Sequence, residues 1–136
     1  MPQELIFPPM GAMALLTFLV LGLIPARRFR AVTAGRATRD DFKFGESAAV
    51  PGDVSIPNRN YMNLLELPLL FYVAGLMYFV AGKVDQPVLM VAWTYVGLRA
   101  IHSIIHLTYN HVMHRLTFFA LSNFVLMAFW LMFFLR

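Results

Sequence analysis

Residues 59–81 read RNYMNLLELPLLFYVAGLMYFVA, and this stretch decides the fold because it begins with polar residues and then turns almost entirely apolar. The hydrocarbon core of a bilayer is about 30 Å thick, so a helix that crosses it needs roughly 20 predominantly apolar residues. Residues 59–81 meet that length. The stretch therefore predicts a transmembrane helix whose first turns carry polar side chains.

Apolar stretches of similar length occupy most of the remaining chain. Of the 136 residues, 60% are hydrophobic and 13% are charged, whereas a soluble domain averages about 45–50% apolar and about 25% charged residues. We therefore expect an all-α membrane protein in which residues 1–136 form a single domain, a four-transmembrane-helix bundle embedded in the lipid bilayer. The expected helices cover residues 6–24, 59–81, 87–107 and 115–135, with one long loop over residues 25–58.

Prolines and short connections set the expected helix ends. Pro8 and Pro9 suit the first turn of a helix, where a missing N–H costs little, and Pro25 is expected to close the first helix. Gly and Pro residues punctuate residues 25–58, which predicts a loop with room for a short helix. Residues 82–86 form so short a link that the helices on either side must be antiparallel neighbours.

The basic residues predict the orientation in the membrane. The net charge is +4, and most Lys and Arg residues follow the first apolar stretch, so topology explains them better than a nucleic-acid partner does. Loops rich in Lys and Arg stay in the cytoplasm, so we expect a cytoplasmic loop and non-cytoplasmic termini. The chain has no cysteine, which excludes disulfides, thiolate metal sites and cysteine nucleophiles.

Polar residues within the apolar stretches lie toward the cytoplasmic end of the predicted bundle. Residues three or four apart share one face of a helix, so two polar stripes are expected. If the stripes face each other, they form a cationic pocket that opens to the cytoplasm. The first stripe holds Arg59, Asn63 and Glu66, and the second holds Arg99, His102, His106 and Tyr109.

Several of these residues also fit simpler roles. Arg59 and Arg115 lie near helix ends and can extend their side chains to lipid headgroups. An ion pair between Arg99 and Glu66 that holds the bundle together is as reasonable as a catalytic role. Asn63 fits interhelical hydrogen bonding as well as ligand binding.

The histidines offer a metal or haem site as a further alternative. His102 and His106 are four residues apart, and His111 and His114 are three apart, so each pair can present two imidazoles to one metal ion. A third ligand is not evident in the sequence, and we expect no metal.

The run of residues 59–68, RNYMNLLELP, resembles the second-helix signature of the MAPEG family, the membrane-associated proteins of eicosanoid and glutathione metabolism. That signature is Arg, three residues, Asn, two residues and Glu. Residues 98–103, LRAIHS, followed by Arg115, resemble the family's third and fourth helices. The pattern is most similar to short bacterial members, which implies a bacterial inner-membrane protein. The resemblance also implies a homotrimer of four-helix subunits.

For function, the resemblance implies a membrane transferase or peroxidase that uses glutathione, bound between neighbouring subunits, against lipophilic electrophiles or hydroperoxides. Arginines suit the two glutathione carboxylates, Glu66 suits the ammonium, and a cation at Arg115 favours the thiolate. His106 stands where a tyrosine is common, and Met62 stands where some members have a glutathione-contacting arginine. The implied catalytic residue is Arg115, and the implied glutathione-binding residues are Arg28, Arg30, Arg59, Asn63, Glu66, Arg99, His102, His106 and Tyr109.

A different class of function stays open beside this enzyme. A chain that keeps the same fold without thiol chemistry would be a non-enzymatic membrane scaffold or an accessory subunit of a larger membrane complex. Glutathione binding separates the two readings, because a scaffold has no need of a cationic pocket that accepts a small acidic thiol.

Overall fold

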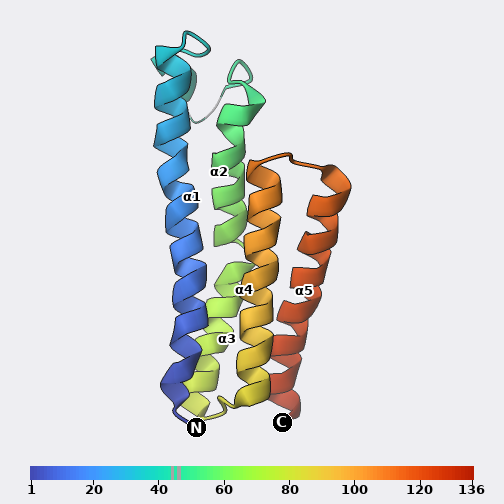
Figure 1. Ribbon diagram of the computed structural model, residues 1–136. Coiled ribbons are helices and arrows are strands. Elements are labelled where there is room, and N and C mark those ends of the chain that lie inside the picture. The colour runs from blue at the N-terminus through green and yellow to red at the C-terminus, as the bar shows by residue number, and fades with distance from the viewer. Residues whose placement is uncertain (44, 46) are drawn as a thin grey trace.

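The computed structural model describes residues 1–43, 45 and 47–136. In these residues there is no strand, and the helical segments run side by side with both chain termini at the same end (Figure 1). Four of them are long and apolar enough to cross a membrane, which confirms the predicted four-helix, all-α membrane bundle. These segments are Gln3–Thr33, Gly52–Ala81, Gln86–Leu107 and Val112–Leu135.

The first helix is longer than the sequence predicted. Helix α1 covers Phe7–Thr33 and contains Pro25 in its interior, so the prediction that Pro25 closes it was wrong. A proline removes one helical N–H, and a membrane helix tolerates that loss. The helix ends where Gly35 adopts a positive φ of 75° and the N–H of Arg36 donates to the carbonyl of Ala31 at 2.9 Å. Glycine reaches this left-handed conformation without steric cost, which makes it the usual stop signal.

Two short 3-10 helices accompany the long ones. Helix η1 (Gln3–Ile6) leads into α1, and η2 (Arg39–Phe42) lies in the connection to the second crossing. The start of η2 is fixed by Thr38, whose backbone N–H donates to the Asp41 carboxylate at 2.9 Å. This turn matches the expected short helix, although the predicted loop over residues 25–58 begins and ends with helical residues.

The second crossing is made of two helices instead of one. Helix α2 (Gly52–Leu65) begins before the predicted start at residue 59, and α3 (Pro68–Ala81) completes the crossing. Between them Glu66 has φ −81° and ψ −95°, outside the helical range. Pro68 explains the break, because it has no N–H for the preceding turn and instead starts α3 at a position that suits proline. The continuous helix predicted over residues 59–81 is therefore corrected.

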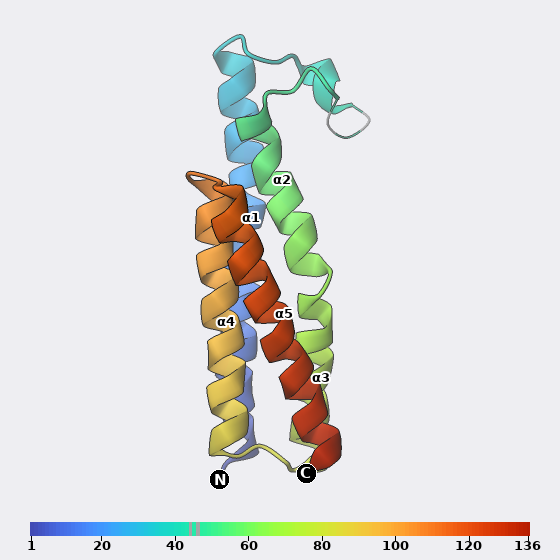
Figure 2. The same cartoon turned by 90° about the vertical axis from the view of Figure 1, so that its right-hand side faces the viewer.

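The last two helices match their predicted ranges to within a few residues. Helix α4 covers Gln86–Leu107 and runs antiparallel to α2 and α3, as the short connection requires (Figure 2). Its start is capped by Asp85, which accepts from the backbone N–H of Val88 at 3.1 Å. Helix α5 covers Val112–Leu135 and packs against α4.

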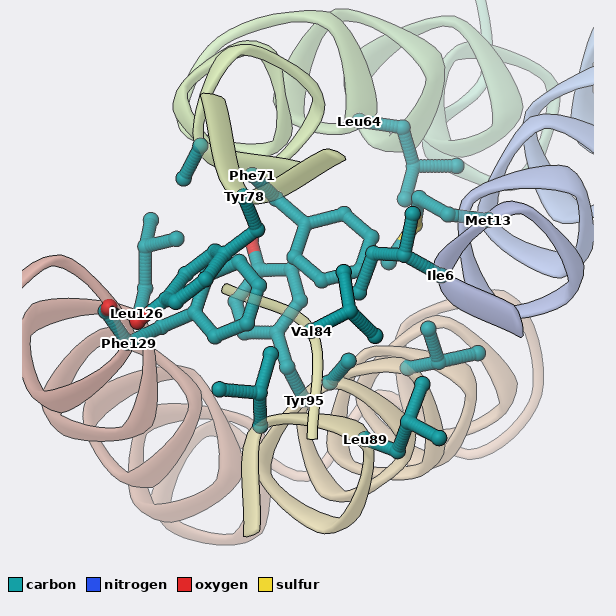
Figure 3. Close-up of a cluster of buried hydrophobic side chains, with 14 of the residues drawn as sticks. Ile6, Met13, Leu64, Phe71, Tyr78, Val84, Leu89, Tyr95, Leu126 and Phe129 are labelled. Atoms are coloured by element: carbon teal, nitrogen blue, oxygen red, sulfur yellow. Dashed lines mark hydrogen bonds between the residues drawn. The ribbon is translucent and has the colours of Figure 1, made fainter. Parts of the chain in front are cut away.

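An aromatic core holds the half of the bundle near the termini (Figure 3). The rings of Phe71 and Tyr95 stack at 4.9 Å, and those of Tyr78 and Phe129 lie 4.7 Å apart. The Tyr78 hydroxyl donates to the Phe129 carbonyl at 2.5 Å. Aromatic pairs at these separations stabilise beyond their burial, so α3, α4 and α5 are fixed together here. The polar residues are left to the other half of the bundle.

Candidate functional site

A pocket of about 380 Å³ is lined by residues of α2, α4 and α5, all from the half of each crossing that lies away from the termini. Its volume falls in the range of pockets that hold small molecules, about 300–1,000 Å³. We call it the polar pocket. Its polar lining comes from three helices, namely Arg59 and Asn63 of α2, His102 and His106 of α4, and Arg115 of α5, and its apolar lining is Val112, Leu116 and Phe119 of α5.

The polar pocket is cationic, because two arginines line it and none of its described lining residues is acidic. Arg115 is half-buried, and its Nη1 donates to the Asn110 side-chain oxygen at 2.8 Å. Asn110 lies in the turn between α4 and α5 and has a positive φ of 47°. The turn therefore positions the Arg115 guanidinium beside the pocket, while the exposed Arg59 faces it from α2.

Arg99 of α4 lies next to the polar pocket, bonded to its lining residue Asn63, and is fully buried. Its Nη2 donates to the backbone carbonyl of Asn63 at 3.3 Å and to the Asn63 side-chain oxygen. The Arg99 Nε and Nη1 atoms have no hydrogen-bond partner among the described residues. Among the described residues, no hydrogen bond or ion pair joins Arg99 to Glu66, which is exposed just after α2. The structural ion pair considered as an alternative role for these residues therefore does not form within one chain.

A second buried polar group supports the histidines. Asn60 is fully buried on α2, and its side-chain oxygen lies 3.4 Å from both the Ser103 hydroxyl and His106 Nδ1. Asn60 is not among the site residues predicted from the sequence. The available signal was its position within the polar start of the second helix, where a buried amide needs partners from another helix.

The structure does not bring every predicted residue into the polar pocket. Arg28 lies over the Phe42 ring at 4.9 Å and lines a separate cavity of about 660 Å³ between α1 and η2. Arg30 is exposed in the last turn of α1. Tyr109 is exposed, with its hydroxyl 3.2 Å from His114 Nδ1. Together with Glu66, these residues lie outside the polar pocket of one chain.

Arg27 is a first-helix arginine that contacts the helices of the site. Its Nη1 donates to the carbonyl of Asp53 at 3.0 Å and its Nη2 to the carbonyl of Leu107 at 3.3 Å. Pro57 explains the first bond, because a proline four residues later leaves the Asp53 carbonyl without its helical donor. Arg27 thus joins α1 to the start of α2 and the end of α4.

The histidine pairs are arranged differently from each other. The rings of His102 and His106 lie 6.0 Å apart beside the polar pocket, whereas those of His111 and His114 stack at 4.2 Å where both residues are exposed. The described residues contain no group of three His, Cys, Asp or Glu side chains that could hold a metal ion. The metal alternative therefore has no ligand set in the described part of the chain.

The fold and the polar pocket define an integral, multi-pass membrane protein with a small cationic site between its helices. In the comparison with protein families, residues 6–135 match the MAPEG family. The chain belongs to this family, which confirms the resemblance found in residues 59–68. Neither the comparison with curated proteins nor the comparison with solved structures found a match.

Proposed function

We propose that this chain is a membrane transferase or peroxidase that binds glutathione in the polar pocket and acts on lipophilic electrophiles or hydroperoxides. The observation that carries the proposal is the convergence of Arg59 and Arg115 on one small pocket whose described lining has no carboxylate. Membership of the MAPEG family supports glutathione-related chemistry in a membrane.

The charges of the polar pocket suit the proposed thiol. Glutathione carries two carboxylates, and a guanidinium binds a carboxylate through two parallel hydrogen bonds. Arg59 stands at the exposed side of the pocket and suits one carboxylate. A free thiol has a pKa of about 8.5, and a neighbouring cation favours its nucleophilic thiolate form. Arg115, held by Asn110, supplies that cation.

The apolar wall of the polar pocket suits the second substrate. Val112, Leu116 and Phe119 all come from α5. Val112 is 61% exposed and Leu116 is 53% exposed, so this wall continues onto the outer surface of the chain. A lipophilic electrophile can therefore approach from the bilayer side of α5 and meet the thiol beside Arg115.

We also propose that the working form is a homotrimer. Glu66 is exposed within a membrane-spanning segment, and an ionised carboxylate facing hydrocarbon is costly. A neighbouring subunit that covers Glu66 removes this cost and can bring further polar residues, such as Arg28 and Arg30, to a shared site. Mass measurement of the purified protein in nanodiscs tests this assembly, and a monomer or dimer would contradict it.

The orientation is part of the same proposal. The basic residues at the end of α1 and in the connection to α2 support a cytoplasmic location for that connection and for the pocket end of the bundle. Because the chain has no cysteine, single cysteines introduced at Ser47 and Gln3 can be labelled without background. A membrane-impermeant maleimide added to intact cells should label the Gln3→Cys variant and leave Ser47→Cys unlabelled. The reverse pattern would contradict the orientation.

Calorimetry of glutathione binding in nanodiscs, followed by turnover of a lipophilic aryl halide, tests the enzymatic proposal. Wild-type protein should bind glutathione, and Arg115→Ala should lose most of its conjugation rate while its assembly is retained. Lys83→Met is the matched control, because Lys83 lies at the opposite end of the bundle and donates to the Phe133 carbonyl. A wild-type protein with no glutathione binding would favour the scaffold alternative, and an unchanged rate in Arg115→Ala would remove Arg115 from the mechanism.

A further inference from the structure

The two ring nitrogens of His106 have different surroundings. His106 is 7% exposed, and its Nδ1 lies 3.4 Å from the side-chain oxygen of Asn60. Among the described residues, no hydrogen bond involves Nε2. Since His106 lines the polar pocket and its Nδ1 faces Asn60 on α2, Nε2 is the nitrogen left for a ligand.

The chemistry of Asn60 decides which nitrogen carries the hydrogen. An amide oxygen accepts hydrogen bonds and cannot donate them, so with the Asn60 oxygen turned toward His106, as the structure places it, Nδ1 is the donor. The Ser103 hydroxyl donates to the same oxygen at 3.4 Å, and Asn60 is fully buried, so the amide is held in place from α4. In a neutral imidazole, a hydrogen on Nδ1 leaves a lone pair on Nε2.

We propose that His106 is the general base of the thiol reaction and that Asn60 is the residue that positions it; this inference rests on the proposed function. The thiol S–H proton passes to His106 Nε2, and the sulfur keeps the bonding electron pair as a thiolate. The thiolate then forms a bond to the electrophilic carbon of the second substrate, and the leaving group departs with its electron pair. His106 returns its proton to water, and the imidazole is neutral again.

The neighbouring residues fit this division of roles. Arg115 lines the same pocket and can stabilise the thiolate, so proton removal and charge stabilisation come from α4 and α5 respectively. His102 also lines the pocket, but its Nδ1 is buried without a partner among the described residues and its ring lies 5.7 Å from that of Phe119. The contact with Asn60 therefore favours the His106 tautomer that leaves a lone pair on Nε2, as a base requires, whereas His102 Nδ1 has no such contact among the described residues.

Nitrogen-15 NMR of histidine-labelled protein in nanodiscs tests the tautomer without any substrate. The His106 signal should show the hydrogen on Nδ1. Asn60→Leu removes the acceptor and should abolish this preference, whereas Asn60→Asp keeps an acceptor oxygen and should retain it. Circular dichroism confirms that each variant is folded. A wild-type His106 with its hydrogen on Nε2 would overturn the inference.

Kinetics tests the base itself. His106→Gln should lower kcat for conjugation roughly 100-fold, within the usual range for loss of a general base, with little change in glutathione affinity. Asn60→Leu should also lower kcat, and Asn60→Asp should rescue it. His111→Asn is the matched histidine control, because it lies outside the pocket and keeps a side chain that can cap α5. It should turn over like the wild type.

The outcomes separate this inference from the proposed function. A wild-type protein that neither binds glutathione nor turns it over overturns both the proposed function and the base role. A wild-type protein that conjugates normally, together with a His106→Gln variant of equal kcat, overturns the base role alone.

Discussion

The buried guanidinium of Arg99 donates hydrogen bonds to both the backbone carbonyl and the side-chain oxygen of Asn63. Asn63 lies in the last turn of α2, just before Glu66 leaves the helical conformation. The final carbonyls of a helix lack helical partners and need other donors. The Asn63 carbonyl also accepts from the Glu66 N–H at 3.4 Å, and Arg99 adds a donor from α4, which fixes a residue that lines the polar pocket.

Removing the Asn63 side chain should therefore lower the free energy of unfolding, because the buried Arg99 charge then lacks an acceptor. Asn63→Leu removes an acceptor from a buried cation, which should lower the free energy of unfolding by about 1–3 kcal/mol. The double variant with Arg99→Met should recover part of that loss, because the buried charge is gone. Unfolding in mixed micelles, followed by circular dichroism, measures both values. Strictly additive losses would show that the two residues are not coupled.

A second coupling is expected between Arg27 and Pro57. Arg27→Met should destabilise the bundle because the carbonyls of Asp53 and Leu107 lose a donor. Pro57→Ala restores the helical N–H that can reach the Asp53 carbonyl, so it should reduce the effect of Arg27→Met. Thermal unfolding of the single and double variants measures this compensation. The matched control is Arg30→Met, at an exposed position of the same helix, and it should leave the Tm nearly unchanged.

Arg59 should contribute to binding more than to the chemical step. Arg59→Gln removes one cation from the exposed side of the polar pocket, so the KM for glutathione should rise about tenfold, which corresponds to about 1.4 kcal/mol. The value of kcat should change little, because this contact is the same in the ground state and the transition state. Steady-state kinetics with varied glutathione tests this, and a lower kcat at an unchanged KM would contradict it.

The end of the bundle near the termini should show a pH dependence of its own. The hydrogen bonds from Arg136 to the Asp85 carboxylate lower the pKa of Asp85. A carboxyl whose pKa is lower in the folded state stabilises the fold above its unfolded pKa of about 3.9. This stabilisation is lost as the pH falls through the lower folded value. The Tm should therefore drop on acidification, and Asp85→Asn and Arg136→Gln should each flatten the acidic part of that profile.

The four spans were predictable because they depend on a coarse property, the length of apolar sequence. The helix ends were harder, because local signals compete. Pro25 reads as a stop signal, yet α1 passes through it and ends at Gly35, where the left-handed backbone actually turns the chain. Pro68 reads as an ordinary residue of a continuous helix, yet it divides the second crossing.

The candidate site was predictable in part for a related physical reason. Helical spacing placed Arg59 and Asn63 on one face, and the structure sets them opposite His102 and His106. Spacing does not say which side chain satisfies a backbone carbonyl on another helix. The hydrogen bonds of Arg27 to α2 and α4 are tertiary contacts of this kind, and the burial of Asn60 also depends on such contacts.

The division of the second crossing has a mechanical consequence. Helices α2 and α3 have 14 residues each, so each helix is about 21 Å long at 1.5 Å per residue. This is shorter than the hydrocarbon core of a bilayer, which is about 30 Å thick. Helix α3 is held by Phe71 and Tyr78 in the aromatic core, whereas α2 carries Arg59 and Asn63. Because the helix is interrupted at Glu66, the bonds from Arg27 and Arg99 set the position of α2 beside the polar pocket, separately from the aromatic contacts that set the position of α3.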